Sequence, residues 1–138
     1  MAIHFFTENI SFALDEENKT VAWIEQVLHR EGCKAKNINY IFCSDDHLLT
    51  LNQQYLKHET FTDIITFDHS EQDESLEADI YISIDRVREN AHSLNKNFTD
   101  ELHRVIIHGL LHLMGLKDKT EADKQEMRKK EDACLSLR

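Results

Sequence analysis

Two histidines lie four residues apart in the stretch HGLLHLMGLKD, which occupies residues 108–118. If this stretch is helical, His108 and His112 lie about 40° apart around the axis, because each residue advances the helix by about 100°. Gly115 then allows the helix to end and the chain to reverse, which brings Asp118 in from a new direction. Two imidazoles and one carboxylate provide three corners of a zinc tetrahedron and leave the fourth for water. The sequence therefore predicts a metal site of His108, His112 and Asp118.

A histidine pair at this spacing has a second interpretation, because nine histidines in 138 residues give on the order of half such a pair by composition alone. Such a pair can simply be hydrogen-bonded at the edge of a core. The glycine and the third ligand favour the metal site. Position 109 is glycine, where zinc peptidases with an H-E-x-x-H motif have their general base, so the sequence argues against peptide hydrolysis by that route. Glu101, two turns earlier, either orients a ligand or assists the start of the helix.

The length of 138 residues predicts a single domain spanning residues 1–138. No apolar run approaches the roughly 18 to 20 residues of a membrane-spanning helix, and the first residues, MAIHFFTENISF, lack the order of a secretion signal. We therefore expect a cytoplasmic protein with no membrane contact. The three cysteines are far apart and odd in number, so we expect reduced thiols.

The net charge of -10 argues against a general attraction to nucleic acid, because an acidic protein repels phosphate. The charge is uneven, however. Residues 1–85 hold five Lys/Arg and seventeen Asp/Glu, a net -12, whereas residues 86–138 hold eleven and nine, a net +2. Six cations in the second part form either a solvated helix face or a phosphate-facing patch: Lys117, Lys119, Lys124, Arg128, Lys129 and Lys130.

Hydrophobic patterns indicate the elements that must position the motif. Runs rich in β-forming residues predict strands at residues 2–8, 37–44, 62–67 and 78–84, with the last two joined as a hairpin-like pair by the acidic connection 68–77. Apolar periodicity predicts helices over residues 20–32, 44–56, 83–95, 99–115 and 120–135. Ser44 and Thr99 are the expected caps of the second and fourth of these helices. Strands and helices do not alternate strictly, which favours an α+β fold with a small mixed sheet of about four strands.

Three stretches resemble the YbeY-type metal-dependent endoribonucleases of bacteria, in the order found in that family. They are LNQQYLKHETFTDIITF at 51–67, ADIYISIDRVRENA at 78–91 and ELHRVIIHGLLHLMGLKDKT at 101–120. The resemblance implies an α+β fold, a zinc-type site at the end of the histidine helix and cleavage of single-stranded RNA. It also implies a part in small-subunit ribosomal RNA maturation and ribosome quality control, with ribosomal RNA and small-subunit proteins as partners.

Two positions depart from what that family commonly has. Asp118 stands where a third histidine is common; a carboxylate still binds zinc at about 2.0 to 2.2 Å, but it makes the site harder and one charge more negative. Leu56 stands where an arginine usually follows the tyrosine of the second-helix motif. Lys57 comes next and can supply a point charge, but not the bidentate contact of arginine with phosphate. We therefore expect this chain to differ in metal preference and phosphate binding.

The predicted chemistry uses one Zn²⁺ per chain, or another divalent transition metal, which lowers the pKa of a bound water and polarises a phosphodiester oxygen. Lys57, Thr62 and Asp63 are expected to line the groove that positions the phosphate. Either Asp63 or a bridging water would accept the proton. Thr62 and Asp63 are equally consistent with simple capping at the start of a strand.

Two other classes of function stay open. The metal could be structural, in a ribosome-assembly factor that binds RNA or a ribosomal protein without cutting it. Hydrolysis of a small ester or amide is the third candidate, and it rests only on the open corner of the metal site.

Overall fold

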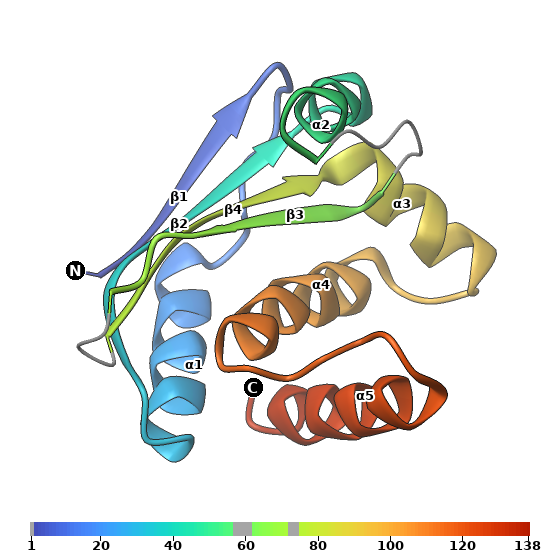
Figure 1. Ribbon diagram of the computed structural model, residues 1–138. Helices are drawn as coiled ribbons and strands as arrows, with labels where there is room; N and C mark the ends of the chain where they lie inside the picture. The colour runs from blue at the N-terminus through green and yellow to red at the C-terminus, as the bar shows by residue number, and fades with distance from the viewer. Residues whose placement is uncertain (1, 57–61, 72–74) are drawn as a thin grey trace.

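The computed structural model describes residues 2–56, 62–71 and 75–138. Four strands form one sheet in the order β1-β2-β4-β3 (Figure 1). Neighbouring strands are parallel except for β3 and β4, which are antiparallel. The strands are β1 (Ile3–Glu8), β2 (Lys34–Cys43), β3 (Ile64–Asp68) and β4 (Ser75–Ser83). The mixed four-stranded sheet and the antiparallel pair confirm the predicted α+β class.

Helices cover the sheet mainly on one face, where α1, α4 and α5 lie (Figure 1). The helices are α1 (Glu17–Arg30), α2 (Asp45–Leu51), which continues into the π-helical turn Asn52–Leu56, α3 (Ile84–Ser93), α4 (Phe98–Leu113) and α5 (Glu121–Leu135). None of the helices in these described ranges is both long and apolar enough to cross a bilayer.

Alternation along the strands separates two apolar clusters, because successive side chains of a strand point to opposite faces. Tyr40 and Phe42 of β2 belong to the main core with α1 and α4. Cys43, the next residue along the same strand, belongs to a smaller cluster with Leu48 of α2 and Ile65 of β3. The face of the sheet that carries the larger cluster therefore packs against α4, the helix that carries the histidines.

Helix α4 is buried on several sides. The stripe of Leu102, Val105, Ile106, Gly109 and Leu113, which share one face of the helix at about 100° per residue, is buried, and so are Ile107, Leu110 and Leu111. In Figure 1, α4 lies between the sheet and α5, which explains why apolar residues outside the stripe are also covered.

Caps define where the helices begin. Ser44 caps α2 as predicted, because its Oγ accepts from the backbone N–H of His47 at 3.1 Å. The predicted cap at Thr99 is wrong: the side-chain oxygen of Asn97 accepts from the N–H groups of Thr99 and Asp100 at 2.8 and 3.3 Å. Asparagine is as good a cap as threonine, and here it starts the helix at Phe98. Thr99 therefore lies within the first turn.

The end of α4 agrees with the sequence interpretation. The helix ends at Leu113, and Gly115 follows with a φ of 104°, a conformation that favours glycine. The chain then reverses and leads to Thr120, whose hydroxyl accepts from the N–H of Asp123 at 3.0 Å and caps α5. This turn places residue 118 beside α4.

Candidate active site

The imidazole of His108 lies between two carboxylates from different segments. Its Nδ1 is 2.7 Å from Oε2 of Glu131 on α5, and its Nε2 is 3.8 Å from Oδ2 of Asp118, which follows the Gly115 turn. The hydrogen bond to Glu131 is the main cause that raises the pKa of His108 above its usual value, with the charges of Glu131, Asp118 and Asp63 adding to it and burial opposing it. The predicted approach of Asp118 to His108 is present in the structure.

A cavity of about 200 Å³ lies at this point. Its wall combines four acids and two bases with two apolar residues: Asp63, Ile64, Glu101, Arg104, Val105, His108, Asp118 and Glu131. Strand β3, helices α4 and α5 and the loop before α5 all contribute. Segments far apart in the sequence thus converge on the first histidine of the motif.

Two donors at this cavity, on His108 and Asp118, have the types and the separation of ligands to a divalent transition metal. In a tetrahedral zinc site with bonds of about 2.0 to 2.2 Å, two donor atoms lie roughly 3.4 Å apart. The distance of 3.8 Å between His108 Nε2 and Asp118 Oδ2 is close to that value. An imidazole nitrogen and a carboxylate oxygen are also donor types that Zn²⁺ accepts.

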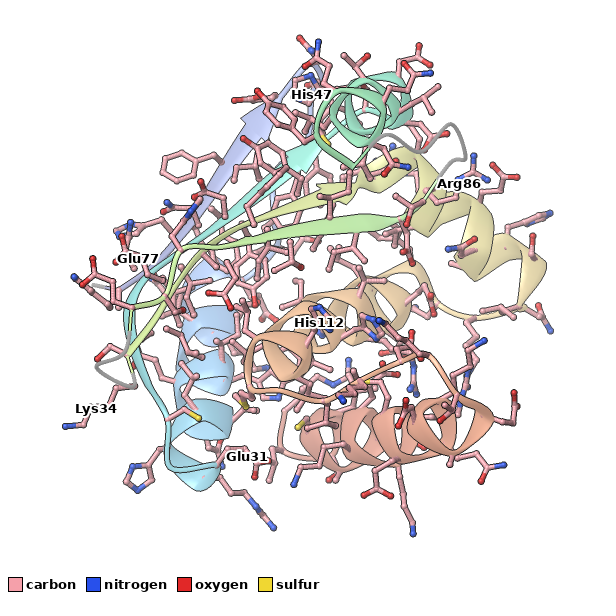
Figure 2. All side chains as sticks on the ribbon, in the orientation of Figure 1. Glu31, Lys34, His47, Glu77, Arg86 and His112 are labelled. Carbon is pink, nitrogen blue, oxygen red and sulfur yellow. The ribbon has the colours of Figure 1, made fainter. Side chains whose placement is uncertain are left out.

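His112 is placed differently. Figure 2 shows it on α4, and its position in the sequence of this helix is one turn beyond His108. Its side chain is exposed, and it is absent from the cavity wall as far as the described residues define it. Within residues 2–56, 62–71 and 75–138, no three His, Cys, Asp or Glu side chains are grouped closely enough to hold a metal ion. The structure therefore brings His108 and Asp118 together without His112.

Two carboxyl groups in the cavity lie in surroundings that disfavour their charge. Burial raises the pKa of Asp63, although the charge of His108 acts in the opposite direction. Burial also raises the pKa of Glu101, partly opposed by Arg104. Glu101 is only 6% exposed, and its Oε1 has no hydrogen-bond partner among the described residues. Both carboxyl groups therefore keep a proton more readily than an exposed carboxyl group, and Glu101 has an oxygen that no described residue binds.

Gly109 explains why the residue after the first histidine is not a general base. A Cβ at this position would lie 2.8 Å from Cδ1 of Ile64 and 3.3 Å from Cγ2 of Ile80. The position faces the sheet rather than the cavity. A glutamate there would be directed into the apolar core.

The residues predicted to bind phosphate have different outcomes. Lys57 lies outside the described residues. Thr62 donates from Oγ1 to the carbonyl of Ile64 at 3.4 Å, a long contact that agrees with its interpretation as a residue at the start of a strand. Asp63, next to it, lines the cavity with His108.

The six cations after the motif do not line the cavity, so far as its described wall extends. Five of them are exposed, which agrees with a solvated face. The sixth, Lys130, is half-buried and forms an ion pair of 2.7 Å with Glu31, the residue that follows the end of α1.

Two residues of the site were missed by the sequence analysis. Glu131 and Arg104 form an ion pair of 2.8 Å across the gap between α5 and α4. The sequence pattern that could have identified Glu131 is its spacing, four residues after Met127 and three before Cys134, which places the three residues on the same helix face. Both neighbours are buried, so a glutamate in this apolar row required a buried partner.

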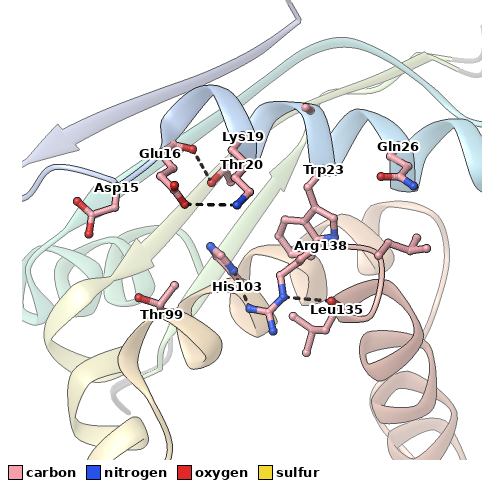
Figure 3. Close-up of a pocket in the computed structure, with 12 residues that line it drawn as sticks. Asp15, Glu16, Lys19, Thr20, Trp23, Gln26, Thr99, His103, Leu135 and Arg138 are labelled. Carbon is pink, nitrogen blue, oxygen red and sulfur yellow. Dashed lines mark hydrogen bonds and ion pairs between the residues drawn. The ribbon is translucent and has the colours of Figure 1, made fainter.

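A larger cavity of about 550 Å³ lies between α1, the start of α4 and the end of α5 (Figure 3). Trp23 lines it, and the indole N–H of this residue donates to the carbonyl of Cys134 at 2.9 Å. His103 lies against Trp23 with ring centroids 5.1 Å apart. None of the predicted site residues lines this cavity.

Comparison with known proteins decides the family. The model of the endoribonuclease YbeY family matches residues 3–137. The chain belongs to the endoribonuclease YbeY family. It is 49% identical to Endoribonuclease YbeY of Cytophaga hutchinsonii over 136 residues, covering 99% of this chain and 95% of that one. It is 51% identical to Endoribonuclease YbeY of Flavobacterium psychrophilum over 132 residues, covering 96% and 94%.

A solved structure agrees with the fold of this YbeY family member. The solution structure of TM1509 from Thermotoga maritima matches with a TM-score of 0.68 and 28% identity, covering 98% of this chain and 87% of that chain. The resemblance noted in the three sequence motifs is thus confirmed over nearly the whole length.

Proposed function

We propose that this protein is a metal-dependent endoribonuclease that hydrolyses phosphodiester bonds of single-stranded RNA. The observation that carries the proposal is the 3.8 Å approach of His108 Nε2 to Asp118 Oδ2 in a cavity that Asp63 also lines. Membership of the endoribonuclease YbeY family supports the same activity.

In this proposal His108, His112 and Asp118 hold the metal. His112 is exposed, and exposed side chains change rotamer on a picosecond to nanosecond timescale, so its imidazole is free to turn toward its neighbour one turn away. A bound Zn²⁺ supplies a water of lowered pKa and a positive charge beside the phosphate oxygens. With one carboxylate in place of an imidazole, the donor set also suits other divalent transition metals.

Asp63 is the proposed proton acceptor. It lines the same cavity as His108, and burial raises its pKa, which makes it a better base than an exposed aspartate. Lys57 is the proposed cation for the phosphate, with Thr62 as a neighbouring hydrogen-bond donor. Both assignments rest on their place in the motif that the chain has in common with the family.

The proposed substrate in the cell is ribosomal RNA of the small subunit, and the proposed role is its maturation and quality control in the cytoplasm, alongside small-subunit proteins. The family resemblance supports this role. The less acidic second part of the chain, which contains α4 and α5, agrees with an RNA substrate.

An assay of purified protein tests the proposal. Single-stranded RNA is incubated with the apo protein, with Zn²⁺ or Mn²⁺ restored, and with a chelator, while elemental analysis measures the bound metal. We expect about one metal ion per chain and internal cleavage that the chelator abolishes. Metal-loaded protein that binds RNA without cutting it would support the assembly-factor alternative. Protein that retains no metal and still cleaves would contradict the metal site.

A further inference from the structure

We propose that Glu131 is a positioning residue that fixes the tautomer and the direction of the His108 ring, so that Nε2 faces the cavity. This inference rests on the proposed function, because it concerns the metal site described there. It gives the last helix, α5, a direct part in that site.

The first step concerns the proton on the imidazole. An ionised carboxylate can only accept hydrogen bonds, so the 2.7 Å contact requires Nδ1 of His108 to carry the hydrogen that Glu131 Oε2 accepts. In a neutral imidazole the other nitrogen then has the free lone pair. That nitrogen is Nε2, which faces Asp118.

The second step concerns how Glu131 is held. Its side chain is 8% exposed, and its other oxygen, Oε1, accepts from Nη1 of Arg104 at 2.8 Å. Arg104 is itself only 17% exposed and also pairs with Asp132 through Nη2 at 2.5 Å. Buried Met127 and Cys134 anchor α5 on either side of this contact. The ion pair with Arg104 and the buried packing of α5 therefore both hold Glu131 in place, and Glu131 in turn holds the ring of His108.

The third step distinguishes Glu131 from its neighbours. Asp118 approaches His108 on the Nε2 side, so it cannot set the Nδ1 hydrogen. Asp132 also contacts Arg104, but its side chain is 60% exposed, and no contact joins it to His108 within the described residues. Asp132 is therefore a matched control: it lies on the same helix, next in sequence, and pairs with the same arginine.

Glu131→Gln gives the sharpest test, because an amide cannot satisfy both partners. If its oxygen faces His108, its NH₂ group meets the donors of Arg104. If its oxygen faces Arg104, its NH₂ group meets Nδ1, which must then accept, and the hydrogen moves to Nε2. The first arrangement loses the Arg104 contact that holds residue 131 in place, and the second blocks the nitrogen of His108 that faces the cavity.

The effect of Glu131→Gln is measured on the tautomer of His108 and on metal binding. Ring ¹⁵N chemical shifts of His108 in the metal-free protein, at a pH where the imidazole is neutral, report the tautomer. Competition with a chromophoric chelator reports the dissociation constant of Zn²⁺, and the visible spectrum of the Co²⁺ form reports the coordination. We expect an Nδ1–H tautomer in the unsubstituted protein. In Glu131→Gln we expect a shift toward Nε2–H and a loss of metal affinity of about 10- to 100-fold.

Asp132→Asn is expected to leave both measurements unchanged. Glu131→Asp keeps the charge with a shorter reach, so it should retain the tautomer and lose less affinity than Glu131→Gln. An Nε2–H tautomer in the unsubstituted protein would overturn the inference, and so would unchanged affinity in Glu131→Gln. If Glu131→Gln does not fold, as judged by circular dichroism, Glu131→Asp and the tautomer of the unsubstituted protein still decide.

The test of Glu131 can be distinguished from the test of the endoribonuclease activity. Loss of metal affinity in Glu131→Gln stands even if the metal-loaded protein does not cleave RNA. Conversely, chelator-sensitive cleavage that is unaffected by Glu131→Gln would leave the endoribonuclease proposal intact and remove the role of Glu131.

Discussion

Gly109 of α4 lies so close to β3 that a Cβ on it would come within 2.8 Å of Cδ1 of Ile64. This contact sets the depth at which α4 packs on the sheet. Because residue 109 faces the sheet, His108 is directed away from it, toward α5 and the cavity. The glycine therefore serves the packing of the helix that positions the histidine.

Substitutions at Gly109 should separate helix propensity from packing. Gly109→Ala gains about 1 kcal/mol of helix propensity. It loses part of that gain by pushing aside Ile64 Cδ1, the end of a flexible side chain, so the net change in unfolding free energy should stay below about 1 kcal/mol. Gly109→Val adds methyl groups against Ile80 as well and should destabilise by about 1 to 3 kcal/mol. Urea denaturation measures both, and equal stability of the two variants would contradict the packing argument.

Glu101 should make the protein less stable as the pH rises. Its pKa is raised in the folded state, so the folded protein holds the proton more tightly than the unfolded chain. The resulting stability is present below the ordinary pKa of glutamate and is lost as the pH rises through the higher folded value. Glu101→Gln should therefore be more stable than the unsubstituted protein at neutral pH and show a shallower decline. Thermal unfolding measured from below the ordinary pKa of glutamate up to neutral pH checks this prediction. Glu126→Gln is the control, because Glu126 is an exposed glutamate of α5.

Asp63→Asn should slow RNA cleavage about 10²-fold or more, the usual contribution of a general base. Because Asp63 is not a proposed metal ligand, the metal content should stay unchanged. Asp68→Asn is the matched control, because Asp68 is an exposed carboxylate at the other end of β3, and its loss should have little effect on the rate. Equal rates for Asp63→Asn and the unsubstituted protein would remove Asp63 from the reaction.

His112→Ala should lose the bound metal and keep the fold, because the side chain is exposed and supports no part of the core. Elemental analysis and circular dichroism measure the two properties. His92→Ala, at an exposed position of α3, controls for the loss of a histidine as such. Stoichiometric metal in His112→Ala would show that the ligand set excludes this residue.

Leu56→Arg restores the arginine that usually follows the tyrosine of the motif in this family. If phosphate contact limits the reaction, RNA cleavage should rise, because a guanidinium binds phosphate through two hydrogen bonds. Leu94→Arg adds the same charge at an exposed position after α3 and should not raise the rate. An unchanged rate in Leu56→Arg would indicate that the existing residues already bind the phosphate well enough.

The sequence was sufficient to predict the elements whose pattern is local. Runs rich in β-forming residues predicted β3 and β4 as a pair, and apolar periodicity predicted the helix α4. The cap at Asn97 was missed because Asn97 and Thr99 are similar capping residues two positions apart, and the choice depends on where the chain enters the helix.

The site was predictable only in part. His108 and Asp118 are ten residues apart and joined by one turn, so local geometry brings them together. The contact between His108 and Glu131 joins two helices and depends on how α5 packs on α4, which no local pattern specifies. Whether His112 joins them depends on the rotamer of an exposed side chain, and sequence spacing does not determine it.

Trp23 gives this molecule a built-in reporter. It is the single tryptophan of the chain, and its indole is tied to the carbonyl of Cys134, one turn beyond Glu131 on the same helix. Detachment of that helix would expose the indole to water and shift its emission to longer wavelength. Intrinsic fluorescence can therefore follow the docking of α5 without a label, in the same sample whose metal binding is being titrated.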